Sequence, residues 1–140
     1  MRELDINNTI EIIDKVLLPK SNYENKEIFP FVKFNSYCKT CNQINTIIIR
    51  PFETGHALSN LFVKNILSKE LILKHGVAKK AAKWQSHLGE LILFNVPALY
   101  TFNKCGNCNQ LFLLVFGIGE VQPGRMVCQI SGLWRVKEKK

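Results

Sequence analysis

The sequence predicts an α+β fold, built on a small and mostly antiparallel β-sheet with an N-terminal helix and a helical insertion. Three observations favour this class. Apolar, β-favouring runs recur along the chain, and isoleucines near its start fall at helical spacing. A lysine-rich middle segment contains breaks at the intervals expected between short helices. The 140 residues and the 46% hydrophobic content fit one globular domain over residues 1–140.

The first predicted element is a helix near the N-terminus. Four apolar residues recur there at the spacing of one helix face: Ile6, Ile10, Ile13 and Leu17. Proline cannot continue a helix, so Pro19 would end it. We therefore expect an amphipathic helix over residues 6–18 that packs on the sheet.

Strands are expected wherever apolar and β-branched residues dominate a short run. The segments that meet this criterion are residues 29–37, 44–52, 90–95, 97–102, 110–116, 126–130 and 133–137. Between the second and third of them, residues 56–86 change in character and predict a helical insertion. We expect two or three short helices there, broken near Ser68 and Gly76.

A short motif occurs twice, once on each side of the predicted insertion. One C-x-x-C pair begins at Cys38 and the other at Cys105, and each is followed by Asn-Gln and an apolar run. A tight turn back into a strand often needs positive φ, which asparagine tolerates better than most residues, and Asn42 and Asn109 occupy that place. The repeated unit is therefore a strand, a tight turn that carries the C-x-x-C pair, and a second strand. We call each of these turns a knuckle.

These pairs predict one shared metal site. Zinc binds four thiolates tetrahedrally, and a two-residue spacer lets two sulfurs face one ion. The predicted ligands of a structural Zn²⁺ are Cys38, Cys41, Cys105 and Cys108. A closed shell of four thiolates leaves no position for water, so such an ion would stabilise the fold without catalysing a reaction. Two reducible dithiols, or unrelated core cysteines, are the alternatives.

Positive charge gathers in the second part of the chain. Residues 61–140 hold twelve Lys or Arg against four Asp or Glu, which accounts for the whole net charge of +8. The predicted partner-binding residues lie in the insertion: Lys64, Lys69, Lys74, Lys79, Lys80, Lys83 and Trp84. Such a segment suits an acidic surface or phosphates. The alternative is a solvated helix face that binds nothing.

The remaining candidates for chemistry are the histidines and the fifth cysteine. His56, His75 and His87 form no metal-binding spacing, and we expect them to be structural or surface residues. Cys128 lies between apolar neighbours, so we expect a small buried core residue. The alternative for Cys128 is a reactive thiolate of low pKa.

The segment from Cys105 to Val136 carries a C-x-x-C pair, a Val-Phe step, glycines and a later cysteine. It resembles the C-terminal part of methionine sulfoxide reductase B, with matching places at Cys105, Cys108, Val115, Phe116, Cys128 and Ser131. The resemblance implies a nucleophilic role for Cys128. The family's asparagine after its nucleophile is replaced by Ile130, however, and its pocket histidines correspond to Leu111 and Leu114.

The paired knuckles around a sheet are also similar to the wider β-tent group, which includes the Yippee proteins. Yippee-type domains are mostly interaction modules, so this resemblance implies binding rather than catalysis. We therefore expect a non-enzymatic, zinc-stabilised protein that docks on an acidic protein partner, for instance a toxin-neutralising immunity protein or a regulatory adaptor. The alternatives are a protein that binds the nucleic-acid backbone and a thiol reductase.

The N-terminus carries charges where a signal peptide would be apolar, and no apolar run approaches the roughly 18 residues of a membrane span. These features predict a soluble, cytoplasmic protein that does not bind membranes.

Overall fold

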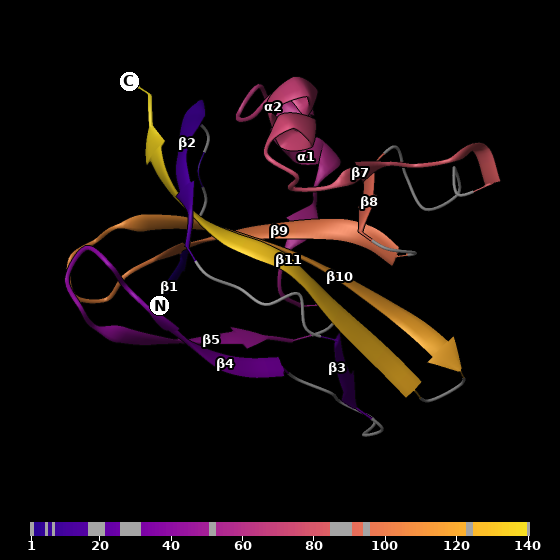
Figure 1. Ribbon diagram of the computed structural model, residues 1–140, viewed down its shortest axis with the longest axis horizontal. Helices are drawn as coiled ribbons and strands as arrows, with labels where there is room; N and C mark the ends of the chain where they lie inside the picture. Colours follow the sequence, from indigo (N-terminus) through magenta and orange to yellow (C-terminus); the bar gives the residue numbers. More distant parts are fainter. Residues whose placement is uncertain are drawn as a thin grey trace.

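A computed structural model describes most of the chain and shows mainly antiparallel β-structure (Figure 1). The described residues are 2–4, 6, 8–16, 22–25, 32–50, 53–84, 91–93, 96–122 and 125–139. Within them, nine strands belong to one large sheet and two form a separate ribbon. The predicted domain of mostly antiparallel β-sheet is therefore confirmed at the level of fold class, although the sheet has more strands than expected.

The large sheet is built around three long neighbouring strands. Its main path runs through β2 (Ile10–Lys15), β11 (Arg125–Glu138), β10 (Leu111–Gln122), β9 (Val96–Lys104), β8 (Leu91–Leu93) and β7 (Lys79–Lys80). Three further strands pair outside this path: β1 (Arg2–Leu4) and β6 (His56–Ala57) with β9, and β3 (Asn22–Asn25) with β11. Every pairing is antiparallel.

The sheet separates two other layers (Figure 1). On one side lie the helices α1 (Ser59–Val63) and α2 (Lys69–Lys74). On the other side lies the ribbon of β4 (Val32–Tyr37) and β5 (Ile44–Ile49). Each layer has its own apolar cluster against the sheet, which we call the helix-side core and the ribbon-side core.

Strand β10 is covered on both faces, because alternate residues of a strand point to opposite sides. Leu113 and Val115 belong to the helix-side core, whereas Phe112, Leu114 and Phe116 belong to the ribbon-side core. All five are fully buried. A strand buried on both faces reads as a continuous apolar run, which explains the sequence LFLLVF.

The ribbon, in contrast, has one solvated face. Residues of β5 alternate between exposed and buried positions. The exposed ones are Ile44, Thr46 and Ile48, and the buried ones are Asn45, Ile47 and Ile49. Ile47 and Ile49 join the ribbon-side core, so this packing attaches the ribbon to the sheet.

The prediction of a helix over residues 6–18 is wrong where the structure describes this segment. Residues Ile10–Lys15 form strand β2, which pairs with β11. Ile10 is buried and Ile13 is 45% exposed, as expected for alternating sides of a strand rather than one helix face. The positions of the isoleucines are compatible with both a helix and a strand, and pairing with the long strand β11 favours the strand.

The helical insertion over residues 56–86 is only partly helical. Helices α1 and α2 lie within it, and Ser68 caps α2 by accepting a hydrogen bond from the Leu71 N–H at 3.2 Å. Gly76, with φ +66°, follows the end of α2, so both predicted breaks are found. Strands β6 and β7 stand within the same segment and pair with the sheet, so the segment is not an all-helical insertion. Residues 85–86 lie outside the described residues.

The predicted strands match β4, β5, β8, β9, β10 and β11, although residues 29–31, 51–52, 90 and 94–95 lie outside the described residues. The two strands expected after residue 125 are one, because β11 continues through Gly132. A Cβ at Gly132 would lie 2.8 Å from both Lys15 Cε and Trp134 Cη2. Only glycine leaves room at this position of β11 for the side chains of Lys15 and Trp134. Across the described residues, neither helix has the length and apolar character needed to span a membrane.

Candidate metal centre

The first knuckle joins β4 to β5 through a tight turn that begins at Cys38. The Asn42 N–H donates to the Cys38 carbonyl at 2.8 Å, and the Cys38 N–H donates to the Gln43 carbonyl at 2.7 Å. The second knuckle, between β9 and β10, repeats both bonds, from Asn109 to Cys105 at 3.2 Å and from Cys105 to Gln110 at 2.9 Å. The repeated sequence therefore forms the same local structure twice.

The asparagine of each knuckle has the backbone conformation predicted from the sequence. Asn42 has φ 63° and Asn109 has φ 64°. Asparagine adopts this left-handed region more readily than most residues other than glycine. The prediction of positive φ at both positions is confirmed.

The two knuckles lie side by side at one end of the molecule (Figure 1), which brings their cysteines together. The four Sγ atoms all lie within 4.8 Å of one another. Cys38 Sγ is 3.7 Å from Cys108 Sγ, and Cys41 Sγ is 3.6 Å from Cys105 Sγ. Four sulfurs placed tetrahedrally about 2.3 Å from one ion are about 3.8 Å apart. The cluster therefore has the size of a site that holds a metal ion.

The cluster is buried on one side and accessible on the other. Cys38 and Cys105, the first cysteines of the two pairs, are each 1% exposed and belong to the ribbon-side core. Cys41 and Cys108 are half-buried at its edge. All five cysteines of the chain are free, so neither pair is bridged within itself.

The sulfurs differ in how readily they lose a proton. Burial raises the pKa of Cys105, but hydrogen bonds from the backbone at Cys108 and Asn107 and from the Asn45 side chain outweigh it and lower the pKa to about 6. The backbone at Gln110 lowers the pKa of Cys108, yet burial and the neighbouring thiols together raise it to about 12. Crowded negative charges oppose one another, and a cation at their centre relieves that repulsion.

Cys128 stands apart from this cluster. It is 4% exposed in the ribbon-side core, and burial raises its pKa to about 12. A thiol with so high a pKa remains protonated near neutral pH, whereas the thiolate is the nucleophile. The predicted burial of Cys128 is therefore confirmed.

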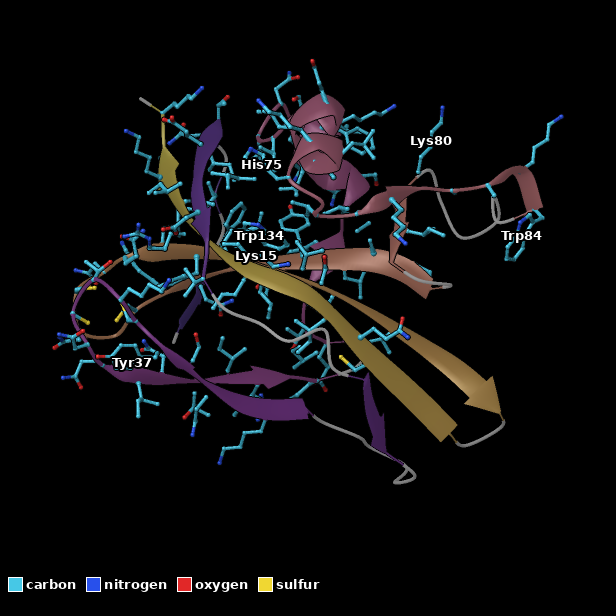
Figure 2. The ribbon with its side chains drawn as sticks, viewed as in Figure 1. Lys15, Tyr37, His75, Lys80, Trp84 and Trp134 are labelled. Atoms are coloured by element: carbon cyan, nitrogen blue, oxygen red, sulfur yellow. The ribbon has the colours of Figure 1, made fainter. Side chains whose placement is uncertain are left out.

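The structure places the predicted partner-binding residues on the helix side of the sheet but does not gather them at one point. Their six lysines are exposed, and Trp84 is 70% exposed. Lys80 points away from the sheet, and Trp84 lies far from His75 and the end of α2 (Figure 2). Lys69 Nζ lies 4.7 Å from the ring centroid of Phe62, so this lysine packs on α1 as well as facing solvent. We call these seven exposed residues, which are spread along residues 64–84, the basic ridge.

Two of the histidines lie outside the metal cluster. His56, in β6, has its ring centroid 5.9 Å from that of Tyr100, and His75 follows the last turn of α2. Neither belongs to the group of cysteines that could hold an ion. His87 lies outside the described residues.

Asn45 is a contact of the cluster that sequence reasoning missed. Its Nδ2 donates to Cys105 Sγ at 3.3 Å, and its Oδ1 accepts from the Gly106 N–H at 3.3 Å. The signal was present in INTIII, where an asparagine shares the inward face of the strand with Ile47 and Ile49. A polar residue at such a position needs a buried partner.

No protein-family model, curated protein or solved structure matches this chain. Its function is therefore inferred from the cysteine cluster and from the exposed charge.

Proposed function

We propose that the four clustered cysteines hold one structural Zn²⁺. The donor set consists of thiolates, which favour zinc, and the distances of 3.6 and 3.7 Å between sulfurs agree with a tetrahedral shell. When bound, the ion supplies a cross-link between the two knuckles. The chain itself positions the sulfurs through two matching turns and excludes water from Cys38 and Cys105.

Elemental mass spectrometry of the purified chain tests this assignment. We expect one zinc per chain, retained on dialysis and removed by a strong chelator at low pH. Tetrahedral sulfur sites also suit iron. A stoichiometric amount of iron would contradict the choice of zinc, and a metal-free chain that folds normally would contradict the site.

We further propose that the protein binds a partner and is not an enzyme. The observation that carries this proposal is the closed donor set of four thiols, which leaves an ion no open position for substrate or water. The fifth thiol, Cys128, is buried, and its raised pKa argues against a reductase that uses it as nucleophile. Iodoacetamide at neutral pH should leave Cys128 unmodified in the folded protein, and rapid alkylation would reopen the reductase alternative.

The proposed partner is an acidic protein surface, contacted by the basic ridge. The lysines of the ridge are accompanied by exposed apolar side chains, with Val63 69%, Leu73 43% and Trp84 70% exposed. Charge steers association, whereas buried aromatic and apolar contacts supply most of the affinity of a protein interface. This combination favours a protein over a phosphate backbone, and an immunity protein or a regulatory adaptor would have such a surface.

A pair of variants with the same change in net charge tests the ridge. In the first, Lys74, Lys79 and Lys80 become Glu; in the control, the exposed residues Lys33, Arg50 and Lys139 become Glu. Proteins captured from the native host by the wild type and the control, but lost with the ridge variant, would support the proposal. Equal capture by all of them would contradict it.

Trp84 offers a direct measurement, because the other tryptophan, Trp134, is 1% exposed. Iodide should quench Trp84 fluorescence in the free protein, and a captured partner should protect it. The nucleic-acid alternative makes a different prediction: mixed-sequence DNA or RNA would protect Trp84, with an affinity that falls steeply as salt rises. That result would replace the protein partner by a nucleic acid.

A further inference from the structure

The two knuckles differ at one buried position next to the sulfurs. When the motifs are superposed by sequence, Asn42, Gln43 and Ile44 correspond to Asn109, Gln110 and Leu111, so Asn45 corresponds to Phe112. Asn45 is 7% exposed and Phe112 is fully buried. One knuckle therefore directs an amide inward where the other directs a hydrocarbon ring.

The Asn45 amide contacts the opposite knuckle through both of its polar atoms. Nδ2 donates to Cys105 Sγ, and Oδ1 accepts from the Gly106 N–H, both at 3.3 Å. The two bonds specify which end of the amide faces the sulfur, because an inverted amide would place an oxygen acceptor against the thiolate. A buried amide held in this way has little freedom to turn.

The contact makes the cluster asymmetric. Cys105 receives the amide hydrogen bond, whereas the matching position that would serve Cys38 holds Phe112, which has no donor. Both sulfurs are equally buried, at 1% exposure each. The difference between them therefore lies in the hydrogen bond to sulfur and not in access to solvent.

We propose that Asn45 is a positioning residue of the metal centre, which orients Cys105 and makes it the ligand that leaves the ion last. This inference rests on the proposed zinc site. An N–H donor to a thiolate lowers the nucleophilicity of the sulfur and fixes its orientation, so Cys105 would be the last of the four sulfurs to react with an alkylating agent. Partners of this kind typically change metal affinity by about 10- to 100-fold when they are replaced.

The variant Asn45→Asp tests the role most directly. It keeps the size of the side chain and an acceptor for Gly106, but it removes the donor to sulfur. Asn45→Leu is a second variant of similar size, uncharged and without a donor, in case the aspartate prevents folding. Asn35→Ala is the matched control, because Asn35 lies on the exposed face of β4 and bonds to Thr46 instead of to a sulfur.

Three measurements on the full chain follow from the proposal. Zinc affinity, measured against a competing chelator, should fall about 10- to 100-fold in the Asn45 variants and stay unchanged in the control. The sulfur-to-cobalt charge-transfer band of the Co²⁺-loaded protein should move to lower energy when the donor is lost. During slow alkylation of the zinc-loaded protein, mass spectrometry should find Cys105 modified last in the wild type and earlier in the variants.

The cobalt spectrum separates positioning from a general loss of stability, because a merely structural residue would leave the band in place. An unmoved band together with an unchanged order of alkylation would overturn the role of Asn45 while leaving the metal site intact. A wild-type chain that binds neither zinc nor cobalt would overturn the metal site and this inference together.

Discussion

The two knuckles have the same backbone turn, but one belongs to a two-stranded ribbon and the other to the large sheet. The first joins the strands of a two-stranded ribbon, and Ile44 just beyond it is 67% exposed. The second joins β9 to β10 in the middle of the large sheet, and Leu111 at the corresponding position is 8% exposed. A local turn thus needs only its own residues, whereas its rigidity depends on the layers packed around it. The proposed ion would attach the less anchored knuckle to the more anchored one.

The largest effect is expected on removal of the metal. In small zinc modules the ion contributes on the order of 10 kcal/mol, and here a core supports the fold as well. We expect Cys41→Ser and Cys108→Ser to lose zinc and much of their stability, as measured by thermal unfolding and metal analysis. Cys128→Ala is the control, because it should retain one zinc per chain.

Hydrogen exchange of the metal-free protein would sharpen the comparison of the two knuckles. Amides of β4 and β5 should exchange much faster once the ion is removed, while those of β9 and β10 remain protected by their neighbours in the sheet. Equal loss of protection in both hairpins would show that the ribbon is no less anchored than the sheet.

The next effect concerns the matched pair Leu111 and Ile44. Leu111→Ala removes a buried side chain from the helix-side core and should cost about 2–5 kcal/mol in the free energy of unfolding. Ile44→Ala changes a mostly exposed side chain and should cost less than about 0.5 kcal/mol. Denaturant titration of both variants measures the difference, and similar costs would mean that Ile44 is covered in solution.

A smaller effect is expected at the turn asparagines. Asn42→Ala and Asn109→Ala should each cost about 1–2 kcal/mol, because both positions have positive φ. Glycine avoids this strain, so Asn109→Gly should be close to neutral. Asn42→Gly should cost about 0.5–1 kcal/mol more, since the Tyr37 hydroxyl donates to Asn42 Oδ1 at 2.8 Å. Equal stability of the two glycine variants would mean that the hydrogen bond from Tyr37 to Asn42 does not stabilise the protein.

A further small effect is expected at the ion pair of Asp14 and Arg135, which links β2 to β11. Arg135 donates two hydrogen bonds to Asp14, at 2.7 and 2.8 Å, and this pairing lowers the pKa of Asp14 despite the opposing effect of burial. A lowered pKa stabilises the fold above the ordinary carboxyl pKa of about 3.9, and the gain is lost as pH falls through the folded value. Asp14→Asn should therefore cost less than about 1 kcal/mol at pH 7, because Asp14 is 41% exposed.

The pH dependence checks the sign of this effect. The difference in unfolding free energy between the wild type and Asp14→Asn should shrink as the pH is lowered below 4. A difference that grows in acid would mean that the pairing with Arg135 is not what stabilises the protein.

The sequence predicts best what short-range chemistry determines. The turns at Cys38 and Cys105, the positive φ of Asn42 and Asn109, and the buried run of β10 all follow from residue type and spacing. The clustering of the four cysteines was also predictable, because identical half-sites imply a shared ion.

The predictions from sequence fail where a segment that is distant along the chain determines the local structure or contact. Residues Ile10–Lys15 carry both a helical and a strand period, and only the presence of β11 favours the strand. Strands β6 and β7 are two residues each and exist through pairing with β9 and β8. Asn45 likewise gains its role from Cys105: the alternation in INTIII places this asparagine on the inward face of β5, but it does not reveal which residue it contacts.

The cysteines that would share the ion lie far apart along the chain, with Cys41 and Cys105 separated by 64 positions. The basic ridge lies wholly inside the loop that they close. A protease that cut one exposed bond within the ridge would thus produce two fragments, each with half of the ligands. The ion would hold these fragments together as one particle, and chelation would weaken their attachment.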